Sequence, residues 1–307
     1  MWVLLAFTSA FFLGFYDIAK KKSLVGNSVL TVLFCNTLFC ALIFLPFILV
    51  SWLQPQLTEG SIFNASLTSE YGKLNGITTL QAHLLVILKA FIVLSSWIMG
   101  YFALKHLPIT IAGPINATRP VLVLMGAVLL FSENLNGFQW AGVTVSILSL
   151  FLLSLSGRKE GIDFKSNKWI FILFGAVIMG AVSGLYDKFI MKQLPPLFVQ
   201  SWFNIYQVAI MGSVLLLLNR YTATKFEWRW WILLISIFIS IADFAYFYAL
   251  SEEDALIAVV SMIRRGSVIV SFSAGALLFK EKNLKSKAFD LVLILIGLAL
   301  LCWGSIK

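Results

Sequence analysis

Hydrophobic residues occur along this chain in long runs that are separated by short clusters of charged and turn-forming residues. A helix needs about 20 apolar residues to cross the hydrocarbon core of a bilayer, and windows of this kind occur ten times. The pattern therefore predicts ten membrane-spanning helices. Their approximate bounds are 2–19, 28–52, 83–104, 109–131, 138–156, 168–188, 197–218, 230–250, 255–279 and 287–305.

The second half of the chain repeats motifs of the first half. GFYDIAKKKSL begins at Gly14 and returns as GLYDKFIMKQL at Gly184. Ten spans divide into two sets of five, and an odd number of spans per repeat inverts the second repeat in the membrane. We expect an all-α integral membrane protein made of two inverted five-helix repeats. The repeats occupy residues 1–156 and 168–307, and a polar linker at 157–167 joins them.

Prolines interrupt the fourth predicted span, which contains Pro114 and Pro120. A proline removes a backbone donor and clashes with the preceding turn, so we expect the helix to be kinked or unwound between these two residues. Irregular backbone is tolerated inside a membrane where it lines a cavity. A central cavity between two repeats is typical of secondary transporters.

Composition and charge support a membrane protein and argue against a nucleic-acid partner. The chain is 60% hydrophobic and 12% charged, which leaves too few polar residues to cover a soluble globule. The net charge of +9 arises from Lys and Arg in short loops, with fifteen in the odd-numbered loops and four in the even-numbered loops and the C-terminus. By the positive-inside rule, the odd loops face the cytoplasm and both termini face outward.

Three arginines are predicted near the middle of the membrane. Arg119 lies in the fourth span, and Arg264 and Arg265 lie in the corresponding ninth span. An unpaired arginine there costs at least about 2.5 to 3.5 kcal/mol, so each must face protein, water or a counter-ion. We interpret the three as an anion-binding pocket. The alternative is that they bind carbonyl groups freed by the kink.

Helical periodicity favours Arg264 over Arg265 as the arginine that faces the cavity. At about 100° per residue, Ser261 falls on the face of Arg264, whereas Arg265 lies about 100° away. In the first half, Asn116 precedes Arg119 at the same spacing. Ser261 and Asn116 are therefore further candidates for the pocket.

Asp243 is the one carboxylate deep inside the predicted core of the second half, at a depth comparable with that of Arg264. We expect a static ion pair between them, with a proton- or substrate-linked carboxylate as the alternative. Trp97 and Tyr101 share a face of the third span, and Tyr246 shares the face of Asp243. These aromatic side chains are expected either to flank the organic part of a solute or to pack between helices.

Two repeated Tyr-Asp pairs, Tyr16-Asp17 and Tyr186-Asp187, lie at the ends of the first and sixth spans. We interpret them as solvated helix ends, because Asp17 can pair with Lys21 one turn later. The long segment 53–82 is interpreted as an insertion on the outer face.

Little in the sequence supports catalysis. The two histidines lie near span edges, and clustered metal ligands and Gly-rich phosphate loops are not found. The three cysteines lie in apolar runs, where buried thiols are expected. We therefore expect neither an enzyme, nor a cofactor, nor a metal site.

The motif LLF-x-E closes the fourth span of each predicted repeat, as Leu129 to Glu133 and Leu277 to Glu281. Together with ten spans in two repeats, it resembles the drug/metabolite transporter superfamily and its EamA-type members. The resemblance covers essentially the whole chain. It implies export or exchange of small organic solutes through a central cavity. It also implies cytoplasmic termini, opposite to the orientation that the charge count favours, and we keep the charge count.

Taken together, the sequence predicts a secondary transporter that exports or exchanges a small organic metabolite with a carboxylate or other anionic group, by alternating access. The alternative is a non-transporting membrane sensor or an intramembrane enzyme. The expected partners are the solute and membrane lipid, with a homodimer left open and nucleic acid not expected, in a multi-pass protein of the cell (inner) membrane. The predicted solute-binding residues are Arg119, Arg264, Asn116, Trp97, Tyr101, Tyr246, Ser261 and Arg265, with Asp243 as the coupling or ion-pair residue.

Overall fold

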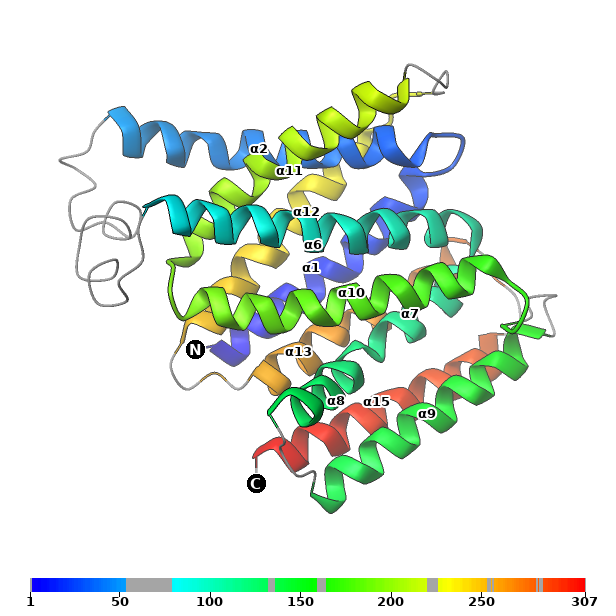
Figure 1. The fold of residues 1–307 in the computed structure, drawn as a ribbon. Helices are drawn as coiled ribbons and strands as arrows, with labels where there is room; N and C mark the ends of the chain where they lie inside the picture. Colours follow the sequence, from blue (N-terminus) through cyan, green and yellow to red (C-terminus); the bar gives the residue numbers. More distant parts are fainter. Residues whose placement is uncertain are drawn as a thin grey trace.

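A computed structural model describes most of the chain and contains α-helices joined by short connections (Figure 1). The described residues are 2–53, 79–131, 136–158, 164–219, 226–252, 255, 257–279, 281 and 284–306. The first-half helices are α1 (Trp2–Ser23), α2 (Val29–Leu53), α6 (Thr79–His106), α7 (Ile109–Ala117), α8 (Arg119–Phe131) and α9 (Gly137–Arg158). The second-half helices are α10 (Lys168–Met191), α11 (Pro196–Asn219), α12 (Trp230–Ser251), α13 (Ile257–Arg265), α14 (Ser267–Leu277) and α15 (Leu284–Ile306).

Six of these helices are long and apolar enough to cross a membrane by length and composition: α1, α2, α6, α10, α12 and α15. The predicted insertion at 53–82 falls almost wholly outside the described residues, as do much of the predicted linker and the motif residue Glu133.

Helices of the first half pack mainly against helices of the second half. The closest associations are α1 with α12, α2 with α11, α6 with α10, and α9 with α15. Figure 1 shows these helices running in roughly the same direction, with both ends of the chain at the same end of the array. The two halves therefore share one core instead of folding as separate bodies.

The fourth span is broken, as its prolines predict. Helix α7 ends at Ala117 and α8 begins at Arg119, and the hydroxyl of the intervening Thr118 donates to the carbonyl of Ile115 at 2.7 Å. The expected irregularity between Pro114 and Pro120 is thus confirmed. Its consequence is that Arg119 stands at a helix terminus in the middle of the molecule.

The ninth span is broken as well, although it has no proline to predict it. Helix α13 ends at Arg265 and α14 begins at Ser267. The amide of the intervening Gly266 donates to the carbonyl of Ile263 at 2.9 Å, and a Cβ atom on the glycine would meet that same carbonyl oxygen at 2.9 Å. The backbone here is too tight for a side chain, which is the local reason for glycine.

The start of α7 is fixed by the glutamate of the LLF-x-E motif in the second half. The Glu281 carboxylate accepts hydrogen bonds from the Ile109 amide at 2.8 Å and from the Thr110 amide at 3.0 Å, and also from the Thr110 hydroxyl. These amides have no partner within their own helix, and a carboxylate also complements the positive end of the helix dipole. Glu281 thereby anchors the broken helix that ends beside Arg119.

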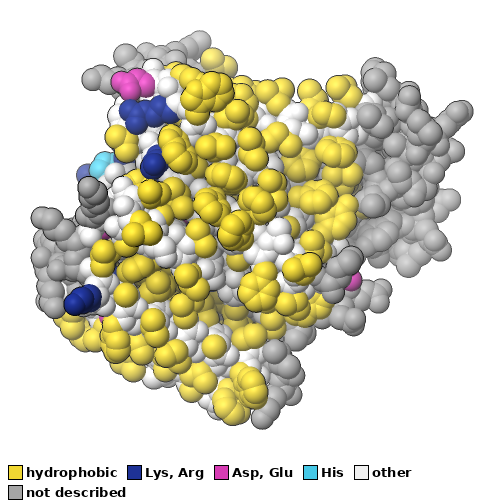
Figure 2. Space-filling view, turned by 180° about the vertical axis from the view of Figure 1, so that it is seen from behind, with side chains coloured by type: hydrophobic (Ala, Val, Ile, Leu, Met, Phe, Trp, Pro, Cys, Tyr) yellow, Lys and Arg dark blue, Asp and Glu magenta, His cyan; other side chains and the backbone are white. Residues whose placement is uncertain are grey.

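The outer surface is a broad apolar face (Figure 2). Over the molecule as a whole, the exposed apolar side chains include Leu4, Phe7 and Phe11 of α1, and Leu88 and Phe91 of α6. So many large apolar side chains exposed together mark a surface that contacts lipid. Lys and Arg side chains in this view gather along one edge of the molecule. The protein is an integral, multi-pass membrane protein.

Candidate functional site

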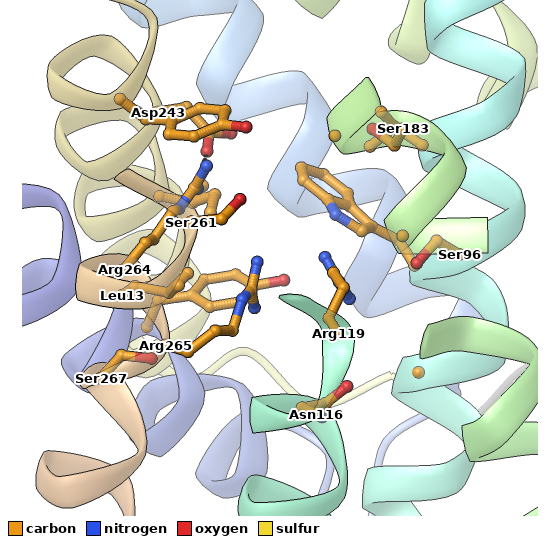
Figure 3. Close-up of a pocket in the computed structure, with 18 of the residues that line it drawn as sticks. Leu13, Ser96, Asn116, Arg119, Ser183, Asp243, Ser261, Arg264, Arg265 and Ser267 are labelled. Carbon is orange, nitrogen blue, oxygen red and sulfur yellow. Dashed lines mark hydrogen bonds and ion pairs between the residues drawn. The ribbon is translucent and has the colours of Figure 1, made fainter. Parts of the chain in front are cut away.

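A polar cavity of about 130 Å³ lies in the middle of the molecule (Figure 3). Its walls come from α1, α6, α7 and α8 of the first half and from α10 to α14 of the second half. One water molecule requires about 10 to 15 Å³ on this measure, so the cavity has room for several waters or for a small solute. Both breaks, at Thr118 and Gly266, lie beside it.

Charged side chains crowd this cavity, with more positive than negative groups. The eight acidic and basic residues on its wall come from six helices of the two halves: α1, α6, α8, α10, α12 and α13. The basic residues are Lys20, Lys89, Arg119, Arg264 and Arg265, and the acidic residues are Asp17, Asp187 and Asp243.

Each of the three carboxylates is paired with one cation. Lys20 Nζ lies 3.3 Å from Asp17 Oδ1 one turn away on α1. Lys89 of α6 is in hydrogen-bond contact with Asp187 of α10. The first pair lies within α1, and the second joins the two halves of the chain.

The third pair joins Arg264 of α13 to Asp243 of α12 through a direct hydrogen bond, so the predicted contact between them is present. The Arg264 guanidinium also lies over the Tyr246 ring, with 4.1 Å between its Cζ atom and the ring centroid. A cation over an aromatic face is stabilised by the ring quadrupole. Arg264 is therefore held in place from two sides.

Arg119 and Arg265 differ from the other three cations because neither forms an ion pair within the described part of the chain. The Nε atom of each is buried and has no hydrogen-bond partner there. Figure 3 shows both guanidinium groups extending into the same cavity. Two positive charges thus face the cavity, and no carboxylate among the described residues pairs with them.

Seven of the predicted solute-binding residues and the predicted ion-pair residue do line this cavity. They are Asn116, Arg119, Trp97, Tyr246, Ser261, Arg264, Arg265 and Asp243. Helical periodicity favoured Arg264 over Arg265, but both line the cavity: Arg265 ends α13, and its long side chain reaches the cavity from the helix terminus.

Tyr101 was expected either to flank a solute or to pack between helices, and it packs: it is not among the residues that line the cavity. It is fully buried, and its hydroxyl lies 3.4 Å from that of Tyr16 and accepts a hydrogen bond from Asn36 Nδ2 at 3.3 Å. Trp97, one turn earlier on α6, does line the cavity. The wall of the cavity turns away from Tyr101, which packs in the apolar cluster formed with α1 and α2.

The interpretation of the two Tyr-Asp pairs as solvated helix ends is wrong. Asp17 and Asp187 both line the cavity, and Asp187 is only 5% exposed. Lys21 does not pair with Asp17 and donates instead to the carbonyl groups of Leu104 and Leu107.

Sequence reasoning also missed Lys89, which is 1% exposed on the cavity wall. A signal for it existed, because a lone lysine inside an apolar span requires a partner. The repeated position of Asp17 and Asp187 was a second signal, since it places one carboxylate in each half.

Comparison with known proteins gives a family match and a fold match. A model of the EamA-like transporter family matches residues 1–155 and 167–303. A search among curated proteins gives no match. One solved crystal structure is similar with a TM-score of 0.63 and 15% sequence identity, over 97% of this chain and 95% of that chain. At this identity the likeness shows a shared fold and nothing more.

Proposed function

Because the chain belongs to the EamA-like transporter family, we propose that it is a secondary transporter that exports or exchanges a small organic metabolite carrying a carboxylate or other anionic group. The family indicates a membrane transporter of small solutes, and its members are transporters and not enzymes. The resemblance to the drug/metabolite transporter superfamily is confirmed by this match.

One observation carries the choice of an anionic solute: Arg119 and Arg265 face a central cavity without carboxylate partners in the described residues. Such charges are unfavourable inside a membrane unless something neutralises them. An anionic group bound between them supplies that neutralisation. Arginine is suited to this role, because its guanidinium presents several donors to a carboxylate or phosphate group.

The remaining wall gives each part of the solute a partner. Asn116 lies next to the break and offers an amide to the polar end of the solute, and Ser261 offers a hydroxyl. Trp97 and Tyr246 provide apolar ring surface for the organic part. Arg264 is already neutralised by Asp243, so in this proposal it shapes the site and contributes less to affinity.

Alternating access between two inverted five-helix repeats, with ten spans in all, is the mechanism that we propose. The packing supports it when α7–α8 and α13–α14 are each counted as one span. The first span then packs against the eighth, the second against the seventh, the third against the sixth, and the fifth against the tenth. Exchange of the two repeats maps this set of pairs onto itself. The breaks at Thr118 and Gly266 supply positions where each broken span can bend.

The proposed location is the cell (inner) membrane, with both termini outward. In support of this orientation, basic side chains gather at one edge of the molecule, opposite to the ends of the chain (Figures 1 and 2). A homodimer remains compatible with the apolar outer surface.

Sealed liposomes test the proposed function. The purified protein is reconstituted, the vesicles are loaded with a mixture of unlabelled organic acids, and entry of labelled acids is followed in the presence of that internal pool. We expect saturable, protein-dependent counterflow of at least one anionic metabolite, which vesicles without protein do not show. The rival interpretations, a sensor or an intramembrane enzyme, predict binding without movement or a chemically altered solute.

A further inference from the structure

The charges around the cavity determine more than the sign of the solute. Three of its five cations are each matched by a carboxylate: Lys20 by Asp17, Lys89 by Asp187, and Arg264 by Asp243. The two opposite charges of each pair neutralise one another within the protein. They leave Arg119 and Arg265 as the cations that a solute would have to balance.

The surroundings hold Arg119 at the cavity. A Cβ atom on Gly180 of α10 would overlap the Arg119 side chain at Cζ, Nε and Nη2, so the guanidinium rests directly against the backbone of α10. Its Nε atom is buried without a partner, as is the Nε atom of Arg265. Both groups therefore retain unused hydrogen-bonding capacity that is directed toward one small space (Figure 3).

From this balance we infer that the solute is a dianion, either a dicarboxylate or a phosphate monoester. This inference rests on the proposed function and specifies its substrate class. Two negative charges on oxygen atoms pair with Arg119 and Arg265 and bring the net charge of the cavity to zero. Arginine binds both carboxylate and phosphate oxygens through paired donors, so either chemistry fits this site.

Solutes of lower charge fit this balance poorly. A monoanion leaves one arginine without a charged partner in the middle of the membrane, where an unbalanced charge is costly. A zwitterion such as an amino acid additionally brings an ammonium group, and every carboxylate that lines the cavity already has a cation. Both classes should bind more weakly than a dianion of the same size.

Pairs of ligands that differ by one charge test the inference. Succinate is compared with succinamate, in which an amide replaces one carboxylate, and glycerol 3-phosphate is compared with its methyl diester, which carries one charge fewer. Each ligand is titrated at pH 8 into the purified full-length protein in detergent, and affinity is obtained from the rise in unfolding temperature.

We expect at least one dianion to bind about ten- to hundredfold more tightly than its twin, the ligand of the same pair with one charge fewer, because that ligand loses one charge-assisted contact. A preference in the succinate pair identifies a dicarboxylate site, and one in the glycerol phosphate pair identifies a phosphate monoester site. Equal affinity within both pairs, tighter binding of the less charged twins, or no binding of either dianion would overturn the inference.

Charge removal from the protein gives a second measurement. Arg265→Gln lowers the positive charge of the cavity by one, so the preference for the dianion over its twin should fall about tenfold or more. Arg229→Gln is the matched control, because this arginine pairs with Glu227 outside the cavity and its loss should leave the preference unchanged. An unchanged preference in Arg265→Gln would also contradict the inference.

The two proposals fail in different ways. If the liposome assay shows movement of an organic solute while neither ligand pair shows a charge preference, the transporter stands and the dianion is refuted. If a dianion binds with the expected preference but no solute moves, the substrate class stands as a binding specificity and the transport proposal fails.

Discussion

Gly180 of α10 lies so close to the guanidinium of Arg119 that a methyl group on the glycine would overlap the Cζ atom of the arginine. The glycine gives a charged side chain the space that helix packing would otherwise fill. Gly180 has no functional group of its own, yet its lack of a side chain helps to set the position of the Arg119 cation in the central cavity.

The first prediction concerns this contact. Gly180→Ala should displace the Arg119 side chain and lower the affinity for the transported anion by about tenfold, comparable to the loss of one charge-assisted contact. Gly137→Ala at the start of α9 is the control, since a Cβ atom there would meet nothing within 4 Å and Gly137 does not line the cavity. Affinity is measured by counterflow in liposomes. Equal transport by the two variants would show that Arg119 adjusts at no cost.

The second prediction concerns the buried pair of Asp243 and Arg264. Asp243→Asn leaves the arginine without its carboxylate, which should destabilise the protein by about 3 kcal/mol, the lower end for a buried pair because the cavity is polar. The double variant Asp243→Asn with Arg264→Gln should recover most of that loss. Unfolding temperature in detergent and the yield of folded membrane protein are the measurements.

An alternative outcome for Asp243→Asn would be informative. If the variant folds normally, still exchanges solute, and loses only the response of transport to a pH difference, the carboxylate is proton-linked and not a static partner.

The third prediction concerns the anchor of α7. Glu281→Gln removes the negative charge of the carboxylate that accepts hydrogen bonds from the amides of Ile109 and Thr110. We expect the protein to lose about 1 to 2 kcal/mol of stability. Glu227→Gln provides the comparison, because its ion pair with Arg229 is exposed and such pairs contribute about 0 to 1 kcal/mol. Similar unfolding temperatures for the two variants would mean that the anchor is not needed.

The fourth prediction concerns orientation. Val25 is exposed in the turn between α1 and α2, and Lys192 is exposed in the turn between α10 and α11. If both termini face outward, a membrane-impermeable thiol reagent should label Lys192→Cys in intact cells and Val25→Cys only after permeabilisation. Labelling of the unsubstituted protein provides the background from its native cysteines. The reverse pattern would assign both termini to the cytoplasm.

Several features could be predicted from sequence because their causes are local. The length of each apolar run sets whether it can cross a bilayer, and the prolines at 114 and 120 remove backbone donors wherever the helix lies. A charge within an apolar run must find a partner or a cavity, so the sequence alone predicts a polar site at Arg119 and at the arginines 264 and 265. The depth of Asp243 suggested its partner for the same reason.

Other features depend on which side chains converge in space. Lys89 and Asp187 are 98 positions apart, and their pairing exists only because α6 packs along α10. Only the packed helices show that Tyr101 turns away from the cavity and that Gly266 breaks a helix without a proline.

The sequence by itself thus determined a membrane-embedded helical protein with cations in its core, because hydrophobicity, proline geometry and the cost of a buried charge act within one helix. Only the tertiary structure decided which cations remain unbalanced. The net charge left at the cavity is the sum of all the charges that the folded helices bring together there, and it depends on which cations pair with Asp17, Asp187 and Asp243.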